Sequence, residues 1–171
     1  IKFDENAILA GKKFANKLWN IARFTLQNVI ASDSEAILDR HGADAPRDDK
    51  PEPKTDADKK ILESLNHLIT SYNHNLDEFK FGQAAHDIYD FVWHDFADIY
   101  IEASKEQTRP PSQAEGVAGA VDDNTKALLL FTLTQTLRLL HPIMPFITEE
   151  IWQELYKQNF VEEKMLCVLK K

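Results

Sequence analysis

The N-terminal segment from Glu5 to Ile30 repeats its apolar positions at the helical period. An advance of ~100° per residue gathers six residues on one side of a helix. These are Phe14, Leu18, Ile21, Ala22, Thr25 and Val29. The opposite side collects lysines and amides, and Phe24 lies among them, next to Lys17 and Asn20. The pattern predicts a helix over this segment whose polar side contains an aromatic ring.

Similar repeats predict further helices along the chain. They are expected from Thr55 to about Asn75, from the turn at 80–83 to about Ser104, from Asp122 or Asp123 to about His141, and from Thr148 onward. Thr55 and Asp58 have the spacing of a capping box. Pro142 and Pro145 are expected to turn the chain between the last two helices, because proline cannot continue the helical hydrogen-bond ladder.

The side chains that these helices are expected to bury follow from the same repeat. For the second helix they are Ile61, Leu62, Leu65, Leu68, Ile69 and Tyr72; for the third, Ala85, Ile88, Tyr89, Val92, Phe96, Ile99 and Tyr100; and for the last, Ile143, Phe146, Ile151 and Trp152. Core packing is also the simplest explanation of the three tryptophans.

The predicted fold is all-α, an antiparallel bundle of four to five helices in a single domain over 1–171. Two stretches rich in proline and polar residues, 31–54 and 105–121, are predicted loops. Near the C-terminus the helical pattern weakens, and "MLCVLKK" could begin a strand.

Composition narrows the class of protein. The chain has 171 residues, of which 43% are hydrophobic and 28% charged, as in ordinary globular domains. No apolar run is long enough to cross a membrane. A single cysteine allows no internal disulfide, which favours a cytoplasmic location. The chain does not begin with methionine, as expected for a piece of a longer protein.

Charge is distributed unevenly. The net charge is −8, yet residues 11–30 carry four basic side chains and no acid. Residues 77–106 carry eight acids against two lysines. Binding to a polyanion depends on the field at the contacting face. A nucleic acid would therefore meet the first helix. The acidic segment is expected to face away from the nucleic acid.

Motifs for catalysis are missing from the sequence. There is no glycine-rich phosphate loop, no HExxH, no GxSxG and no cysteine pair, so no catalytic residue, cofactor site or metal site is predicted. His86-Asp87 and His94-Asp95 are the exception to consider, because histidine–aspartate pairs ligate metals in some phosphohydrolases. Their separation of eight residues would require ligands from other helices, so we expect solvated polar residues at these positions.

The polar side of the first helix has a chemistry of its own. Lysine binds phosphate, amides pair with base edges, and an aromatic ring stacks on an unpaired base. This mixture suits a single-stranded RNA loop rather than duplex DNA. The predicted RNA-binding residues are Lys13, Lys17, Asn20, Arg23 and Phe24.

Three motifs resemble a known family. "KKFANKLWNIARFTLQN" is similar to the first helix of the anticodon-binding domain of class I aminoacyl-tRNA synthetases in its valyl form. "YDFVWHDFADIYIEASK" resembles the third helix of that domain, and "LRLLHPIMPFITEEIWQ" resembles its most recognisable signature. The resemblance extends over nearly the whole chain and is weakest in 31–54 and 106–121.

The resemblance implies recognition of a valine-type tRNA anticodon loop by the first helix. It also implies a catalytic domain in the same polypeptide, which would join valine to tRNA with ATP and Mg²⁺. The family's HIGH and KMSKS motifs are absent here, so neither ATP nor magnesium is expected to bind this chain. The residues leave two alternatives open: a helical protein-interaction domain that uses the acidic helix, and a metal-dependent phosphohydrolase.

Overall fold

The computed structural model describes residues 5–30, 51–107 and 123–166. All regular secondary structure within these ranges is helical, which confirms the predicted all-α bundle. The predicted loops and the predicted C-terminal strand fall mostly outside these ranges.

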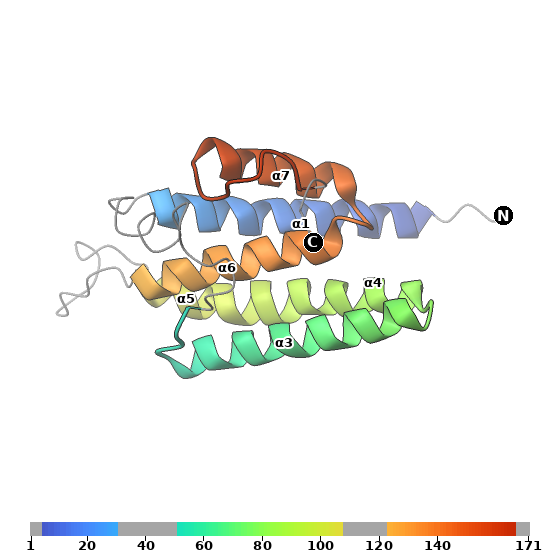
Figure 1. The fold of residues 1–171 in the computed structure, drawn as a ribbon, viewed down its shortest axis with the longest axis horizontal. Helices are drawn as coiled ribbons and strands as arrows, with labels where there is room; N and C mark the ends of the chain where they lie inside the picture. The colour runs from blue at the N-terminus through green and yellow to red at the C-terminus, as the bar shows by residue number, and fades with distance from the viewer. Residues whose placement is uncertain (1–4, 31–50, 108–122, 167–171) are drawn as a thin grey trace.

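The helices run back and forth along one common direction (Figure 1). They are α1 (Glu5–Ile30), α3 (Asp56–Asp77), α4 (Phe81–Asp90), η1 (Phe91–Tyr100), α5 (Ile101–Gln107), α6 (Asp123–Leu140) and α7 (Pro145–Lys157). Within the ranges described, no helix combines the length and apolarity needed to cross a membrane. α5 continues to Gln107, so the loop predicted from 105 starts later than expected.

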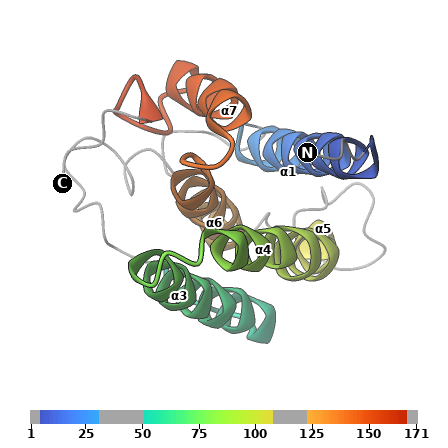
Figure 2. The same cartoon turned by 90° about the vertical axis from the view of Figure 1, so that its right-hand side faces the viewer.

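α6 is the central helix of the bundle. It lies between α1 and α7 on one side and α3 and α4 on the other (Figure 2). Most of its side chains are buried, including the leucines at 128, 129, 133 and 137. Burial all round a helix is expected where neighbours cover every face. α1 therefore packs along the outside of a core that α6 fills.

α1 buries the side that its sequence predicts. Phe14, Leu18, Ile21, Ala22, Thr25 and Val29 are all buried. The predicted face of α3 is buried as well, except for the half-buried Ile69. The predicted capping box is also confirmed, because Thr55 Oγ1 accepts from Asp58 N at 3.1 Å and Asp58 Oδ2 accepts from Thr55 N at 2.9 Å.

The third predicted helix is formed by α4, η1 and α5 in succession, and η1 is a π-helix. The amide of Ile101 donates to the carbonyl of Phe96, a bond that spans five residues instead of four. The burial predicted for Ile99 is wrong, since it is 42% exposed, whereas Phe91 is only 3% exposed. The predicted burial of Ile88, Val92, Phe96 and Tyr100 is confirmed, and the further buried positions 91, 97 and 101 each lie five residues from 96 or 92, a step that a repeat of ~3.6 residues does not predict.

The last helix begins earlier than predicted. α7 starts at Pro145 rather than Thr148, since proline suits the first helical position. Thr148 is buried in the first turn, and its Oγ1 lies 2.8 Å from His141 Nδ1. Ile151 and Trp152 are buried as expected. The predictions for Ile143 and Phe146 are wrong, because both side chains are exposed. Since α7 already includes Phe146, the helical period turns this side chain away from the face that carries Ile151.

Candidate nucleic-acid interface

The outer side of α1 forms a continuous polar surface, which we call the basic face. Its residues are all exposed and fall within ~100° of helical arc: Lys12, Lys13, Asn16, Asn20, Arg23 and Gln27. The only acid in α1 is Glu5, in the first turn. Among the described residues, no side chain bonds to Lys13 or Arg23. The basic face thus presents three cations, Lys12, Lys13 and Arg23, and several amides to an external partner.

Lys17 lies at the margin of the basic face and has partners within the bundle. Its Nζ is 2.9 Å from Asp98 Oδ1 on η1 and 5.1 Å from the ring centroid of Trp93. Trp93 stacks on Tyr89 at 5.6 Å, and Tyr89 stacks on Phe14 of α1 at 5.1 Å. This aromatic series joins α1 to α4 and η1 beside the basic face.

Phe24 occupies the same margin as Lys17, seven residues or about two turns further along α1. Its side chain is half-buried and packs against the hydrophobic core. The expectation that this ring stands on the fully solvated side is therefore wrong. The helical wheel places it only ~20° from Lys13 and Lys17, so the exposed part of the ring still borders the basic face.

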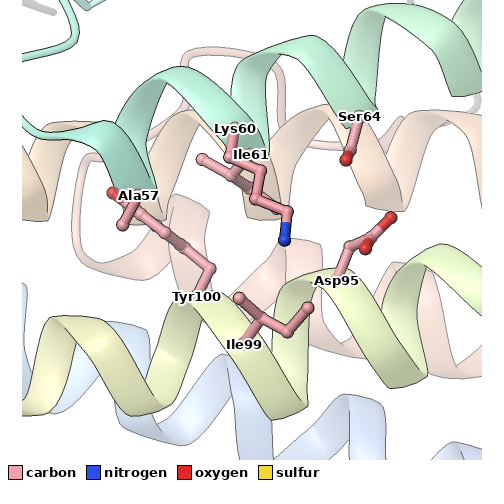
Figure 3. Close-up of a pocket in the computed structure, with 7 residues that line it drawn as sticks. All are labelled: Ala57, Lys60, Ile61, Ser64, Asp95, Ile99 and Tyr100. Atoms are coloured by element: carbon pink, nitrogen blue, oxygen red, sulfur yellow. The ribbon is translucent and has the colours of Figure 1, made fainter.

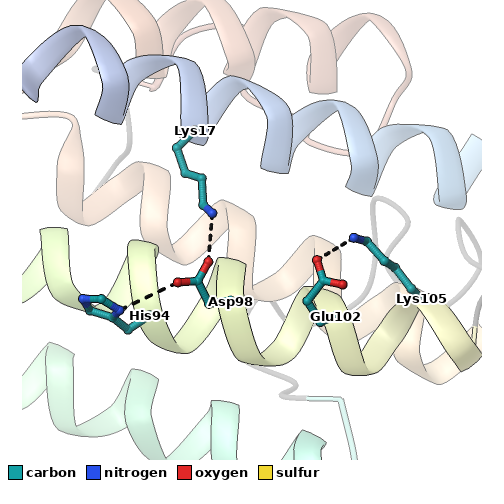
Figure 4. Close-up of polar contacts among 5 residues, drawn as sticks. All are labelled: Lys17, His94, Asp98, Glu102 and Lys105. Atoms are coloured by element: carbon teal, nitrogen blue, oxygen red, sulfur yellow. Dashed lines mark hydrogen bonds and ion pairs between the residues drawn. The ribbon is translucent and has the colours of Figure 1, made fainter. Parts of the chain in front are cut away.

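An acidic side chain of η1, Asp98, lies beside the margin of the basic face. Asp98 contacts Lys17, and it lies 3.8 Å from His94 Nδ1 (Figure 4). One turn further, Glu102 pairs with Lys105 at 2.5 Å (Figure 4). Asp98 thus brings one carboxylate of the acidic segment to the margin of α1, and the orientation of this segment away from RNA stays a prediction. The carboxylate marks one edge of the surface that a polyanion could occupy.

The two histidines considered as metal ligands lie beside carboxylates of their own helix. His86 Nε2 is 3.5 Å from Asp90 Oδ2, and His94 Nδ1 is 3.8 Å from Asp98 Oδ2. Both histidine side chains are more than half exposed. In the part of the chain that the structure describes, no group of three or more His, Cys, Asp and Glu residues is arranged to bind a metal ion.

A small hollow lies between α3 and η1. It is lined by Ala57, Lys60, Ile61, Ser64, Asp95, Ile99 and Tyr100, and its cavity volume is only about 10 Å³ (Figure 3). Small-molecule sites usually enclose ~300–1,000 Å³. The lining is mainly apolar and carries one amine and one carboxylate. Nothing in this hollow favours an enzymatic site over the surface of α1.

The structure brings together three of the five sequence-predicted residues, Lys13, Asn20 and Arg23, as exposed neighbours on the basic face. The other two, Lys17 and Phe24, lie at its margin. Sequence reasoning left out Lys12, Asn16 and Gln27 as candidates, although the same helical wheel contains them. It could not find the contact with Asp98, because that residue is 81 positions away and the contact depends on how two helices pack.

Comparison with known proteins identifies the family. The sequence model of "Anticodon-binding domain of tRNA ligase" matches residues 58–169. The valine–tRNA ligase of Enterococcus faecalis is 39% identical over 159 residues, which cover 93% of this chain and 16% of that protein. The valine–tRNA ligase of Streptococcus pyogenes serotype M1 is 37% identical over 164 residues, covering 94% of this chain and 17% of that protein.

These relatives extend the comparison beyond the matched family region. The valine–tRNA ligase of Bacillus cereus is 38% identical and covers 91% of this chain, so the alignment includes at least part of α1. The chain spans about one sixth of the length of the curated relatives it matches. The helical bundle, the family match over most of the chain and these identities agree. This chain belongs to the family of anticodon-binding domains of tRNA ligases.

Proposed function

We propose that this chain binds the anticodon loop of a valine tRNA through the basic face of α1, as one domain of a longer valine–tRNA ligase. The observation that carries the proposal is the exposure of Lys13, Asn20 and Arg23 on one side of α1, which carries no acid beyond Glu5 in the first turn. The family and the names of the relatives support the class of RNA. The rest of the ligase would attach valine to the tRNA with ATP and magnesium, in the cytoplasm.

The side chains of the basic face have distinct roles in this proposal. Lys13 and Arg23 contact phosphates, because ammonium and guanidinium groups bind phosphate oxygens. The exposed amide of Asn20 can both donate to and accept from a base edge, so it reports sequence. The open part of Phe24 stacks on an unpaired base. Contacts of these kinds suit a loop whose bases are splayed out of the helical stack.

Lys17 has a lesser share in phosphate binding than its charge suggests. Its ammonium group is held by Asp98 at 2.9 Å and lies over Trp93. A phosphate would have to compete with a carboxylate already in place. We therefore assign Lys17 to the positioning of α1 against η1, next to the RNA, and Lys13 and Arg23 to the backbone contacts.

Binding of anticodon stem-loops tests the proposal. The valine tRNA stem-loop and the same stem-loop with a replaced anticodon are titrated against this chain at two salt concentrations, with fluorescence anisotropy as the readout. We expect a preference of about tenfold for the valine anticodon, since one good side chain–base pair is worth ~1–3 kcal/mol. Asn20→Ala should reduce this preference. Equal affinity for both stem-loops, or no binding to either, would overturn the proposal.

A further inference from the structure

One end of the bundle carries most of the exposed large apolar side chains. The start of α1, the turn between α3 and α4, and the turn between α6 and α7 all lie at that end (Figures 1 and 2). We call the exposed apolar side chains of these three segments the apolar end. They are Ile8, Leu9, Phe79, Phe81, Ile143 and Phe146. Exposed apolar side chains gathered from separate segments mark an interaction surface more often than scattered ones do.

Phe79 shows that local stability does not explain this surface. Its φ angle is 58°, in the left-handed region that glycine and asparagine adopt at lower cost. Its side chain is nonetheless 80% exposed. In the described ranges, the other non-glycine residue with a positive φ angle is Asn159, and asparagine is of a type suited to that conformation. The backbone at Phe79 closes the C-terminus of α3, where the amide of Lys80 donates to the carbonyl of Asn75 at 2.7 Å, but the ring itself is left mostly in solvent.

The ring of Phe81 adjoins that of Phe79, and Phe146 lies on α7 at the same end of the bundle (Figure 1). Phe81 is 60% exposed, and its ring meets that of Phe79 edge to face, with centroids 6.1 Å apart and an interplanar angle of 87°. Phe146 is 91% exposed on the first turn of α7. It points away from the core face that carries Trp152. Three phenylalanines from two turns thus present apolar area that this chain does not bury.

We propose that the apolar end is a docking surface for the remainder of the same polypeptide, and that it sets the direction of α1 within the whole ligase. This inference rests on the proposed function, because it requires a longer ligase. The partner surface is expected to be apolar and tethered. The curated relatives have about six times the length of this chain, since it covers 16% of each.

The position of α1 supports this occupant over a second copy of the chain. α1 begins at the apolar end (Figure 1), so any sequence that precedes Glu5 reaches the bundle there. Tethering gives such a segment a high effective concentration, so a modest apolar area suffices for stable contact. A separate copy would have no tether and would need an interface of about 1,000 Å² or more.

Docking at this end would leave the later turns of the basic face, with Asn20 and Arg23, free for RNA, whereas Lys13 lies about one turn from Leu9. Leu9 and Arg23 are 14 residues apart on α1, which corresponds to ~21 Å along the helix at 1.5 Å per residue. The same helix thus carries the docking contact in its first turns and the proposed RNA contact in later turns. Fixing the first turns fixes the direction in which the basic face points. The apolar end would act as a rigid mount for the anticodon-binding surface.

Hydroxyl-radical footprinting tests this proposal, because it measures the oxidation of individual phenylalanine rings. Phe79, Phe81 and Phe146 are compared in this chain alone and in the longer polypeptide that contains it. We expect severalfold lower oxidation of all three rings in the longer polypeptide. Oxidation of Tyr156, an exposed ring at the opposite end of α7, serves as the internal reference and should not change.

A pair of variants separates docking from folding. Phe79→Ser combined with Phe146→Ser should restore oxidation of Phe81 in the longer polypeptide, whereas Ile99→Ser, at an exposed position on η1, should not. Circular dichroism of each variant checks the fold. Equal oxidation of the rings in both forms would contradict the docking surface. Protection that appears in this chain alone and grows with its concentration would contradict the tethered occupant in favour of a second copy.

The affinity of this chain for the anticodon stem-loop distinguishes the two proposals. It is measured without the remainder of the polypeptide, so a failure of docking leaves it unchanged. Loss of the anticodon preference with intact protection of the rings would contradict the proposed function and leave the docking surface in place.

Discussion

The Nζ of Lys17 on α1 lies 2.9 Å from Oδ1 of Asp98 on η1, although 81 residues separate them in the chain. The same ammonium group lies 5.1 Å from the ring centroid of Trp93. Lysine and aspartate side chains here are 30% and 49% exposed, so water screens the pair only in part. The contact joins two helices at the edge of the basic face and gives Lys17 a structural partner before any RNA arrives.

Lys17→Ala is expected to lower the free energy of unfolding by ~1 kcal/mol, the sum of a partly exposed ion pair and a cation–π contact. Urea unfolding measures this change. Lys105→Ala is the matched control, because its pair with Glu102 lies within one stretch of helix and is worth only ~0.2–0.5 kcal/mol. If Lys17→Ala leaves stability unchanged but weakens RNA binding as much as Lys13→Ala, the structural role of Lys17 is wrong.

Replacements of Phe24 should separate its packing from its stacking. Phe24→Leu keeps most of the apolar contact with the core, so stability should change little. Loss of the ring should weaken binding of the anticodon stem-loop by ~1–3 kcal/mol. Phe24→Ala should also destabilise the fold, because the ring is half-buried. Phe24→Leu with unchanged RNA affinity, measured by the same anisotropy titration, would remove Phe24 from the interface.

Trp152→Ala should destabilise the bundle by ~3–5 kcal/mol, as for other buried large aromatics. Trp152 is fully buried, and its Nε1 donates to the carbonyl oxygen of Glu163 at 2.8 Å. Arg138 lies over the ring, with Cζ 5.7 Å from its centroid. Thermal and urea unfolding measure the loss. A change as small as that of Phe146→Ala, at a 91% exposed position, would contradict this packing.

Acid should weaken the contact between α3 and α4 through Asp87. Burial tends to raise the pKa of Asp87, but hydrogen bonds from Ser71, Gln83 and Asn75 and the nearby His86 together lower this pKa below its usual value. A carboxyl whose pKa is lowered by folding stabilises the fold above its unfolded-state pKa. That stability is lost as pH falls through the depressed pKa.

The free energy of unfolding, measured in urea from about pH 5 downward, should therefore fall less steeply in Asp87→Asn than in the unchanged chain. Asp77→Asn, at an exposed position on α3, is the control and should follow the unchanged chain. Identical slopes for Asp87→Asn and the unchanged chain would show that these hydrogen bonds do not favour the ionised carboxyl.

The sequence predicts those features that depend on a regular repeat. Residues of α1 follow ~3.6 residues per turn, so its buried side and its basic face were both predictable. The capping box of α3 is local as well, since its two members are three positions apart. Where the repeat changes, the same reasoning fails. In η1 the hydrogen bonds span five residues, so Phe91 turns inward and Ile99 outward without any proline or glycine to signal it.

Long-range contacts were beyond prediction for a different reason. The pair Lys17–Asp98 depends on the packing of α1 against η1, and no spacing in the chain encodes it. The sequence pattern predicts Phe146 in the core because Thr148 offers a plausible helix start, three residues after the actual start of α7. Because α7 begins at Pro145, Phe146 belongs to its first turn and is exposed. The half-burial of Phe24 likewise depends on what packs beside the margin of α1.

Salt dependence of anticodon stem-loop binding tests most directly whether the basic face of α1 contacts RNA. Each lost phosphate contact should reduce the slope of log affinity against log salt by ~0.7 for single-stranded RNA. The double variant Lys13→Ala with Arg23→Ala should thus reduce the slope by ~1.4, twice that value. Lys59→Ala with Lys157→Ala, at exposed positions on α3 and α7, removes the same charge and should leave the slope unchanged. Equal reductions by the two double variants would contradict binding through α1.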